Sequence, residues 1–106
     1  MLVHDVDGDG DADIVWARGH HLGLYWLEQG TRDGQRTFTW HTIDTSWSQG
    51  HSLLLADLDG DGHVELVAGK RYLGHDGKDL GEYDPLGIYA SQFDRETRSF
   101  RRTTLV

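Results

Sequence analysis

The chain has 106 residues, a formal charge of −8, and 26% charged against 37% hydrophobic residues, which suits a folded protein with a polar surface. Lys and Arg total 10 and form no basic stripe, and no apolar run approaches the about 18 residues of a membrane span, so we expect neither nucleic-acid nor membrane binding. There is no cysteine, so disulfides give no indication of the redox compartment.

The first half of the chain predicts four short β-strands. Apolar and β-branched runs of strand length are separated by glycine and acidic turn signals, and no stretch shows helical periodicity. The expected strands are Met1–Asp5, Ile14–Ala17, Gly23–Leu27 and Phe38–Ile43. The connector Glu28–Thr37 is expected to be a polar turn. Residues 1–46 are therefore interpreted as one four-stranded antiparallel unit with a truncated first strand.

The second half repeats this order after a polar link, Thr45–Gly50. Its expected strands are Ser52–Leu58, Val64–Gly69, Gly87–Ser91 and Phe100–Leu105. The connector over residues 70–86 is much longer than its counterpart, Arg18–Leu22, in the first half. Residues 47–106 are interpreted as a second unit, so the predicted fold class is all-β, with two four-stranded antiparallel sheets.

An acidic nine-residue pattern lies between the first two strands of each unit. Residues 57–65 place carboxylates at positions 1, 3, 5 and 9, a glycine at 6, and a backbone carbonyl at 7, as in calcium loops. The predicted ligands are Asp57, Asp59, Asp61, Glu65 and the carbonyl of His63, with Asp5, Asp7, Asp9, Asp13 and position 7, Asp11, in the first copy. Hard oxygen donors and the absence of cysteine favour Ca²⁺ over zinc or copper. The alternative is two Asp-Gly turns that bind nothing.

This pattern is not an EF-hand, because Trp16 and Ala68 stand where position 12 requires glutamate and strands flank the loops. It resembles instead the FG-GAP/VCBS repeat, the blade of calcium-carrying β-propellers such as the integrin α-subunit head. The resemblance implies that each unit is a propeller blade. Two blades leave two apolar faces bare, which predicts self-association, with three or four chains closing a ring of six or eight blades. A domain-swapped or open dimer of a larger propeller's piece is the alternative.

The end of the sheets opposite the acidic loops collects polar, aromatic and histidine residues suited to carbohydrate. The candidate catalytic residues there are His20, His21, His51, Arg71 and His75. The segments Arg18–Trp26 and Gly50–Leu53 are similar to blades of bacterial proteins related to aldos-2-ulose dehydratase, and propeller-shaped polysaccharide lyases are a similar neighbour. In such chemistry a histidine removes a proton beside a carbonyl and a cation steadies the enolate.

Three functional interpretations stay open. The first is a calcium-binding propeller unit with a structural or ligand-binding role. The second is part of a sugar dehydratase or polysaccharide lyase, a carbon–oxygen lyase, with its histidine site opposite the metal loops. The third is an excised or engineered fragment without activity. Millimolar calcium outside cells suits such loops, so we expect an extracellular or periplasmic parent protein, although Met1–His4 is too short for a signal peptide.

Overall fold

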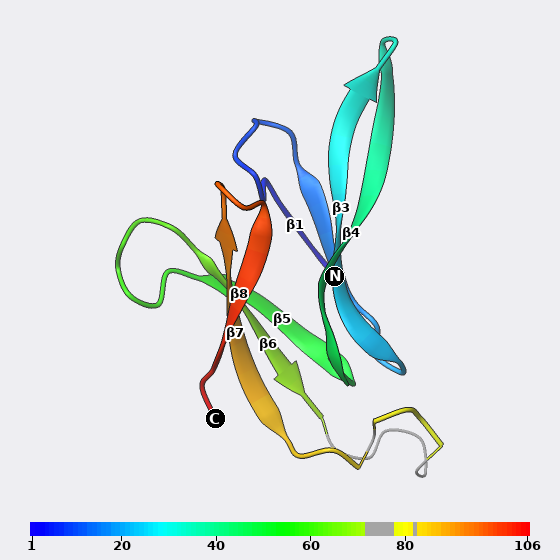
Figure 1. The fold of residues 1–106 in the computed structure, drawn as a ribbon, viewed down its shortest axis with the longest axis vertical. Helices are drawn as coiled ribbons and strands as arrows, with labels where there is room; N and C mark the ends of the chain where they lie inside the picture. Colours follow the sequence, from blue (N-terminus) through cyan, green and yellow to red (C-terminus); the bar gives the residue numbers. More distant parts are fainter. Residues whose placement is uncertain (72–77, 82) are drawn as a thin grey trace.

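A computed structural model describes residues 1–71, 78–81 and 83–106, and its described part contains eight strands in two four-stranded antiparallel sheets (Figure 1). The predicted all-β class is confirmed. Sheet 1 has the order β1-β2-β3-β4, and sheet 2 has the order β5-β6-β7-β8. The strands are β1 (Leu2–His4), β2 (Asp13–Ala17), β3 (Leu22–Arg32), β4 (Gln35–Ser48), β5 (Gly50–Ala56), β6 (Glu65–Lys70), β7 (Gly87–Asp94) and β8 (Ser99–Thr104). Nowhere in the described segments does a helix have the length and apolar character needed to cross a membrane.

The turn expected over Glu28–Thr37 is wrong, because β3 and β4 continue through it as one long hairpin. The register pairs Glu28 with Thr39 and Arg32 with Gln35, and only Asp33 and Gly34 remain in the loop. Both have positive φ, 52° and 76°, which suits a two-residue turn that matches the twist of the strands. The hairpin tip extends beyond the rest of the molecule (Figure 1).

The polar link expected over Thr45–Gly50 is also strand for most of its length. β4 ends at Ser48 and β5 begins at Gly50, so Gln49 alone joins the sheets. Gln49 has a φ of 61° and no solvent exposure. Strand β5 lies earlier in the chain than expected, over Gly50–Ala56 in place of 52–58, and leaves Asp57 and Leu58 to the following loop.

The hydrophobic core lies between the two sheets. Side chains alternate across a strand, so Val15 and Trp26, which are paired across β2 and β3, share one face of sheet 1. That face packs on the face of sheet 2 that carries Leu66 and Ala68. The Trp26 ring meets Phe93 edge-on at 5.7 Å between centroids, and Trp47 contacts Tyr89 at 5.0 Å. The opposite face of sheet 1 and the opposite face of sheet 2 remain outside this core.

Candidate metal centres

The two acidic segments form loops of the same backbone geometry. In loop 1 (Asp5–Asp13), Asp5 Oδ1 accepts hydrogen bonds from the amides of Gly8 and Asp9 at 2.9 and 3.1 Å, and its Oδ2 accepts from Gly10 at 3.0 Å. The first carboxylate thereby organises the turn around itself. Gly8 and Gly10 adopt φ of 75° and 95°, conformations that side-chain-bearing residues rarely take.

Loop 2 (Asp57–Glu65) repeats this arrangement. Asp57 Oδ1 accepts from the amides of Gly60 and Asp61 at 2.8 and 3.1 Å, and Oδ2 accepts from Gly62 at 2.9 Å. Because the same three amides fold onto the first aspartate in both loops, the remaining carboxylates are turned toward a common centre. The repeated sequence pattern therefore corresponds to a repeated three-dimensional structure.

Carboxylate oxygens converge in both loops. One oxygen from each of Asp57, Asp59, Asp61 and Glu65 lies within 4.8 Å of the others, and Asp5, Asp7 and Asp13 form an equivalent group. Both clusters could hold a metal ion, and an all-oxygen donor set suits hard cations such as calcium, magnesium or manganese.

Three residues of the predicted ligand set lie outside these groups. The Asp9 carboxylate accepts the amide of Asp11 at 2.8 Å. The amide of His63 donates to Asp61 at the same distance. The structure thus places the position-7 residues, Asp11 and His63, beside the carboxylate clusters through their backbones, and their role as carbonyl ligands stays a prediction.

The last carboxylate of each loop is buried. Asp13 has no solvent exposure, and its two oxygens accept the amides of Val6 and Gln29 at 2.9 and 2.8 Å. Glu65 is 7% exposed, and its Oε2 accepts the amide of Leu58 at 2.7 Å. Its Oε1 is buried and has no hydrogen-bond partner. A buried carboxylate oxygen without a partner is costly unless a ligand satisfies it, so loop 2 fits a bound cation.

The electrostatics of the loops also favour a cation. Burial raises the pKa of Asp7 and of Asp13, and the neighbouring Asp9 carboxylate adds to both shifts. At Asp59 the amide of Asp61 lowers the pKa, but desolvation and the charges of Asp61 and Glu65 outweigh it, and the pKa is raised. The pKa of Asp57 is lowered, because the amides of Gly62 and Gly60 donate to it. Crowded carboxyl groups resist ionisation, and a positive ion placed among them stabilises their charged form.

The opposite end of the molecule brings together some of the candidate catalytic residues. His20 Nδ1 lies 3.0 Å from Asp79 Oδ2, and the His20 and His51 rings meet edge-on at 5.6 Å. Gln49 links this pair to Arg71, since its amide donates to Asp79 at 3.1 Å and accepts from Arg71 Nε at 3.0 Å. Gln49 and Asp79 were not among the candidate catalytic residues.

The candidate His21 does not join this cluster. His21 is exposed, and its backbone amide makes only a long contact, 3.5 Å, with the carbonyl of Arg18. His75 lies outside the described residues.

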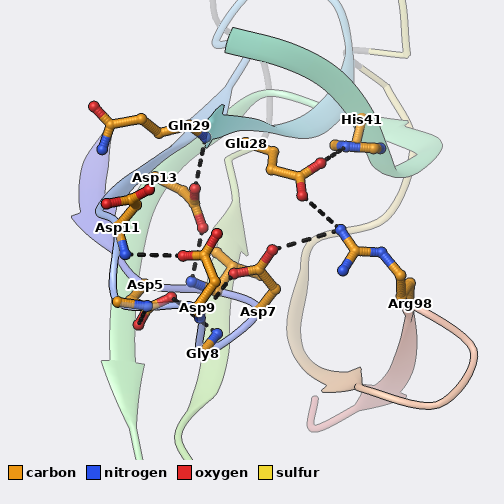
Figure 2. A network of polar contacts seen from close by, with 12 residues as sticks. Asp5, Asp7, Gly8, Asp9, Asp11, Asp13, Glu28, Gln29, His41 and Arg98 are labelled. Atoms are coloured by element: carbon orange, nitrogen blue, oxygen red, sulfur yellow. Dashed lines mark hydrogen bonds and ion pairs between the residues drawn. The ribbon is translucent and has the colours of Figure 1, made fainter. Parts of the chain in front are cut away.

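Sequence reasoning missed a second set of residues beside loop 1. Arg98 lies in the turn between β7 and β8, and its Nη2 lies 2.7 Å from Glu28 Oε1 and 3.5 Å from Asp7 Oδ2 (Figure 2). His41 Nε2 lies 2.6 Å from the other oxygen of Glu28. No local pattern predicts these contacts, because 91 positions separate Arg98 from Asp7.

Comparisons with known proteins agree with the loop geometry. A family profile described as an FG-GAP-like repeat matches residues 5–68. Rhamnogalacturonan endolyase YesW of Bacillus subtilis (strain 168) is 35% identical over 75 residues, which are 63% of this chain and 12% of that protein. The chain therefore spans about an eighth of the length of this curated relative. No solved structure matches the chain.

Proposed function

Since the chain belongs to the FG-GAP-like repeat family, we propose that its two acidic loops bind Ca²⁺ and that the ions fix two blade-like sheets for assembly into a propeller. The observation that carries the metal proposal is the buried Oε1 of Glu65, which has no protein partner and belongs to a cluster of four carboxylates. Asp5, Asp7 and Asp13 are the corresponding ligands in loop 1. The bound ion would neutralise carboxylates that otherwise repel one another.

Calcium is the proposed ion because the donors are all oxygens and are carried on irregular loops. Calcium accepts six to eight oxygens in irregular geometry, whereas magnesium requires a near-octahedral set and keeps several waters. Sites in extracellular modules bind calcium with dissociation constants of about 10⁻⁴–10⁻³ M. At about 10 mM calcium, each such site would add about 1.4–2.7 kcal/mol to the free energy of unfolding.

The metal proposal is tested by thermal unfolding of the wild-type protein and of Glu65→Gln, in calcium and in EDTA. Calcium is expected to raise the melting temperature of the wild type by about 4–8 °C for each kcal/mol of binding free energy. Glu65→Gln removes a ligand of loop 2, so the calcium-dependent rise should fall to roughly half. Asp33→Asn is the matched control, because it removes one exposed negative charge at the hairpin tip. A wild-type melting temperature that ignores both calcium and EDTA would refute the proposal.

The assembly proposal rests on the two outer faces of the sheets. The outer face of sheet 1 carries an aromatic cluster in which Trp40 lies 4.9 Å from both Trp16 and Tyr25. Trp40 is 51% exposed. The outer face of sheet 2 carries the exposed aliphatic side chains Leu54 and Ile88.

The two outer faces have the chemistry of the two inner ones. In the sequence repeat, Trp16 of sheet 1 corresponds to Ala68 of sheet 2, which lies in the core. In the same way, Val15 of sheet 1 corresponds to Val67 of sheet 2. The outer face of sheet 1 therefore corresponds to the inner face of sheet 2, and a neighbouring sheet 2 would repeat the contact seen within the chain. Such head-to-tail contacts close into rings when the rotation permits. Sedimentation is expected to give three or four chains, and a stable monomer would contradict self-assembly.

We propose as a second candidate that the cluster opposite the loops binds acidic polysaccharide or contributes to its cleavage. It is favoured by the relative named as a rhamnogalacturonan endolyase, by the contact of His20 with Asp79, and by the edge-on contact of the His51 ring with the His20 ring. An imidazole would act as the base that removes a proton next to a carboxylate, and Arg71 would supply positive charge.

The lyase proposal is tested by incubating the protein with rhamnogalacturonan and following ultraviolet absorbance, because elimination creates a double bond conjugated to a carboxylate. The absorbance is expected to rise for the wild type and to remain flat for His51→Ala. A flat trace for the wild type would reject cleavage by this chain and leave the structural role.

A further inference from the structure

The turn between β7 and β8 of sheet 2 lies against loop 1 of sheet 1, and it does so through two arginines. The Arg95 guanidinium covers Gly8 so closely that a Cβ at this glycine would come within 2.6 Å of its Nη2. Arg98 reaches Glu28 on β3 and Asp7 in loop 1. Figure 2 shows Arg98 between these two carboxylates. Sheet 2 therefore supplies cationic groups to the metal loop of the other sheet.

Arg98 is held in place by a chain of contacts that begins in the core. The His41 ring stacks on Trp26 with centroids 4.6 Å apart and planes 21° apart. His41 Nε2 lies 2.6 Å from Glu28 Oε2, and the other oxygen of Glu28 accepts from Arg98. The pKa of Glu28 is lowered because these bonds from His41 and Arg98 outweigh the effect of its burial. The guanidinium is thus fixed by its partner rather than by its own partly exposed side chain.

Asp7 is restrained on both oxygens. Oδ1 accepts the amide of Asp9 at 3.2 Å, and Oδ2 faces Arg98 at 3.5 Å. Its side chain is only 5% exposed. A carboxylate held in this way has little rotational freedom left to lose when it coordinates an ion.

Among the residues that the structure describes, none gives loop 2 an equivalent of this arrangement. Asp59 occupies the repeat position of Asp7, is exposed, and has no ion pair within the described residues. Gln92 occupies the repeat position of Glu28 and donates instead to Asp61 at 3.3 Å. The two loops share a backbone but differ in what surrounds them.

We propose that Arg98 is a positioning residue that orients Asp7 for the cation of loop 1, so that this site is complete only when sheet 2 is docked on sheet 1. The proposal rests on cation binding by loop 1, as put forward above. Glu28 balances the charge of Arg98, so the pair brings orientation without net repulsion of the ion. Thermodynamic linkage makes this coupling reciprocal. If docking of sheet 2 raises the affinity of loop 1 for the ion by some factor, the bound ion strengthens the docking of sheet 2 by the same factor.

The test is a calcium titration followed by the amide NMR signals of two glycines in each loop, Gly8 and Gly10 against Gly60 and Gly62. In Arg98→Gln, the midpoint of the loop 1 signals is expected to move to about 10–100-fold higher calcium, the usual cost of removing a group that supports a ligand. The loop 2 signals should keep their wild-type midpoint. Arg36→Gln, an exposed change of the same charge in β4, should move neither loop.

The outcomes separate this inference from the metal proposal. Arg98→Lys keeps the positive charge but replaces the planar guanidinium with a compact ammonium group. Its loop 1 affinity for calcium should therefore lie between that of the wild type and that of Arg98→Gln. If the loop 1 midpoint is unchanged or moves to lower calcium in Arg98→Gln, or if both loops move together, the positioning role is refuted. If neither loop of the wild type responds to calcium, the metal proposal itself fails.

Discussion

Two tryptophans on opposite faces of sheet 1 provide a direct test of how the sheets pack. Trp26 is 2% exposed and lies between His41 and Phe93, at 4.6 and 5.7 Å between ring centroids. Trp40, on the adjacent strand, is 51% exposed. Its ring meets those of Trp16 and Tyr25, which both belong to its own sheet. Replacing each with alanine removes the same atoms from two different environments.

The expected costs differ because the buried areas differ. A buried tryptophan replaced by alanine costs about 3–5 kcal/mol, which is a large fraction of the about 5–15 kcal/mol that stabilises a typical protein. A half-exposed tryptophan buries about 75–125 Å² at most, which corresponds to about 2–3 kcal/mol as an upper bound. Trp26→Ala is therefore expected to reduce the free energy of unfolding well beyond Trp40→Ala.

Urea unfolding followed by far-ultraviolet circular dichroism measures both variants, since the signal does not depend on the replaced fluorophore. Each variant is compared as the monomer, at a protein concentration too low for assembly, and in calcium-free buffer, so that neither assembly nor metal binding contributes. If Trp26→Ala costs no more than Trp40→Ala, the two sheets do not pack through the Val15 and Trp26 face, and the inter-sheet core described above is wrong.

Three further predictions concern single sites. In sedimentation, Trp40→Ala should shift the assembled protein toward monomer, and an unchanged mass would exclude this face from the assembly contact. Burial raises the pKa of Asp44, but hydrogen bonds from Ser46 and Arg102 outweigh this effect, and the pKa is lowered. The stability that Asp44 contributes is therefore present above about pH 4 and is lost as the pH falls through the pKa of Asp44 in the folded protein. The difference in urea stability between wild type and Asp44→Asn should therefore shrink in acid, and a constant difference would contradict the cause given. Gly23→Ala, at φ 124° and in collision with the Tyr25 hydroxyl, should cost about 1–3 kcal/mol by thermal unfolding, whereas Gly30→Ala on the same strand should cost less, and equal costs would refute the backbone argument.

The sequence was sufficient for the parts of the molecule that depend on local pattern. The spacing of Asp57, Asp59, Asp61 and Glu65 predicted a loop in which these carboxylates converge, and their oxygens lie within 4.8 Å of one another. The strands followed from apolar runs between glycine-containing turns, because alternation along a strand is a local property. The same nine-residue pattern begins at Asp5, so the same prediction applies to a loop of the other sheet.

Local pattern failed where a polar segment is held by its partner strand. The stretch from Glu28 to Thr37 contains few apolar residues, yet the Asp33-Gly34 turn pairs its two halves as strands. The Asp33-Gly34 turn signal is present in the sequence, and its two-residue length fixes the pairing of the segments on either side.

The contacts between distant segments could not be predicted at all. Arg98 meets Asp7, and Asp79 meets His20, only because the two sheets pack at a particular angle. Candidate residues chosen by chemistry alone included His21, which remains exposed apart from the cluster. The position of a charged side chain relative to another sheet depends on tertiary packing, which a single sequence does not display.

The joint at Gln49 has a consequence for how many units a larger assembly can contain. A single residue with a φ of 61° connects β4 to β5, and its amide is tied on both sides, to Arg71 and to Asp79. The rotation from one sheet to the next is thus constrained by one pair of backbone torsions together with the packing of the two sheets, and it is not averaged over a flexible linker. In a tandem array every such joint would contribute the same increment of rotation, and the increments must sum to a full circle for the array to close. A change at this one position would alter the closing number without changing any carboxylate of the two acidic loops.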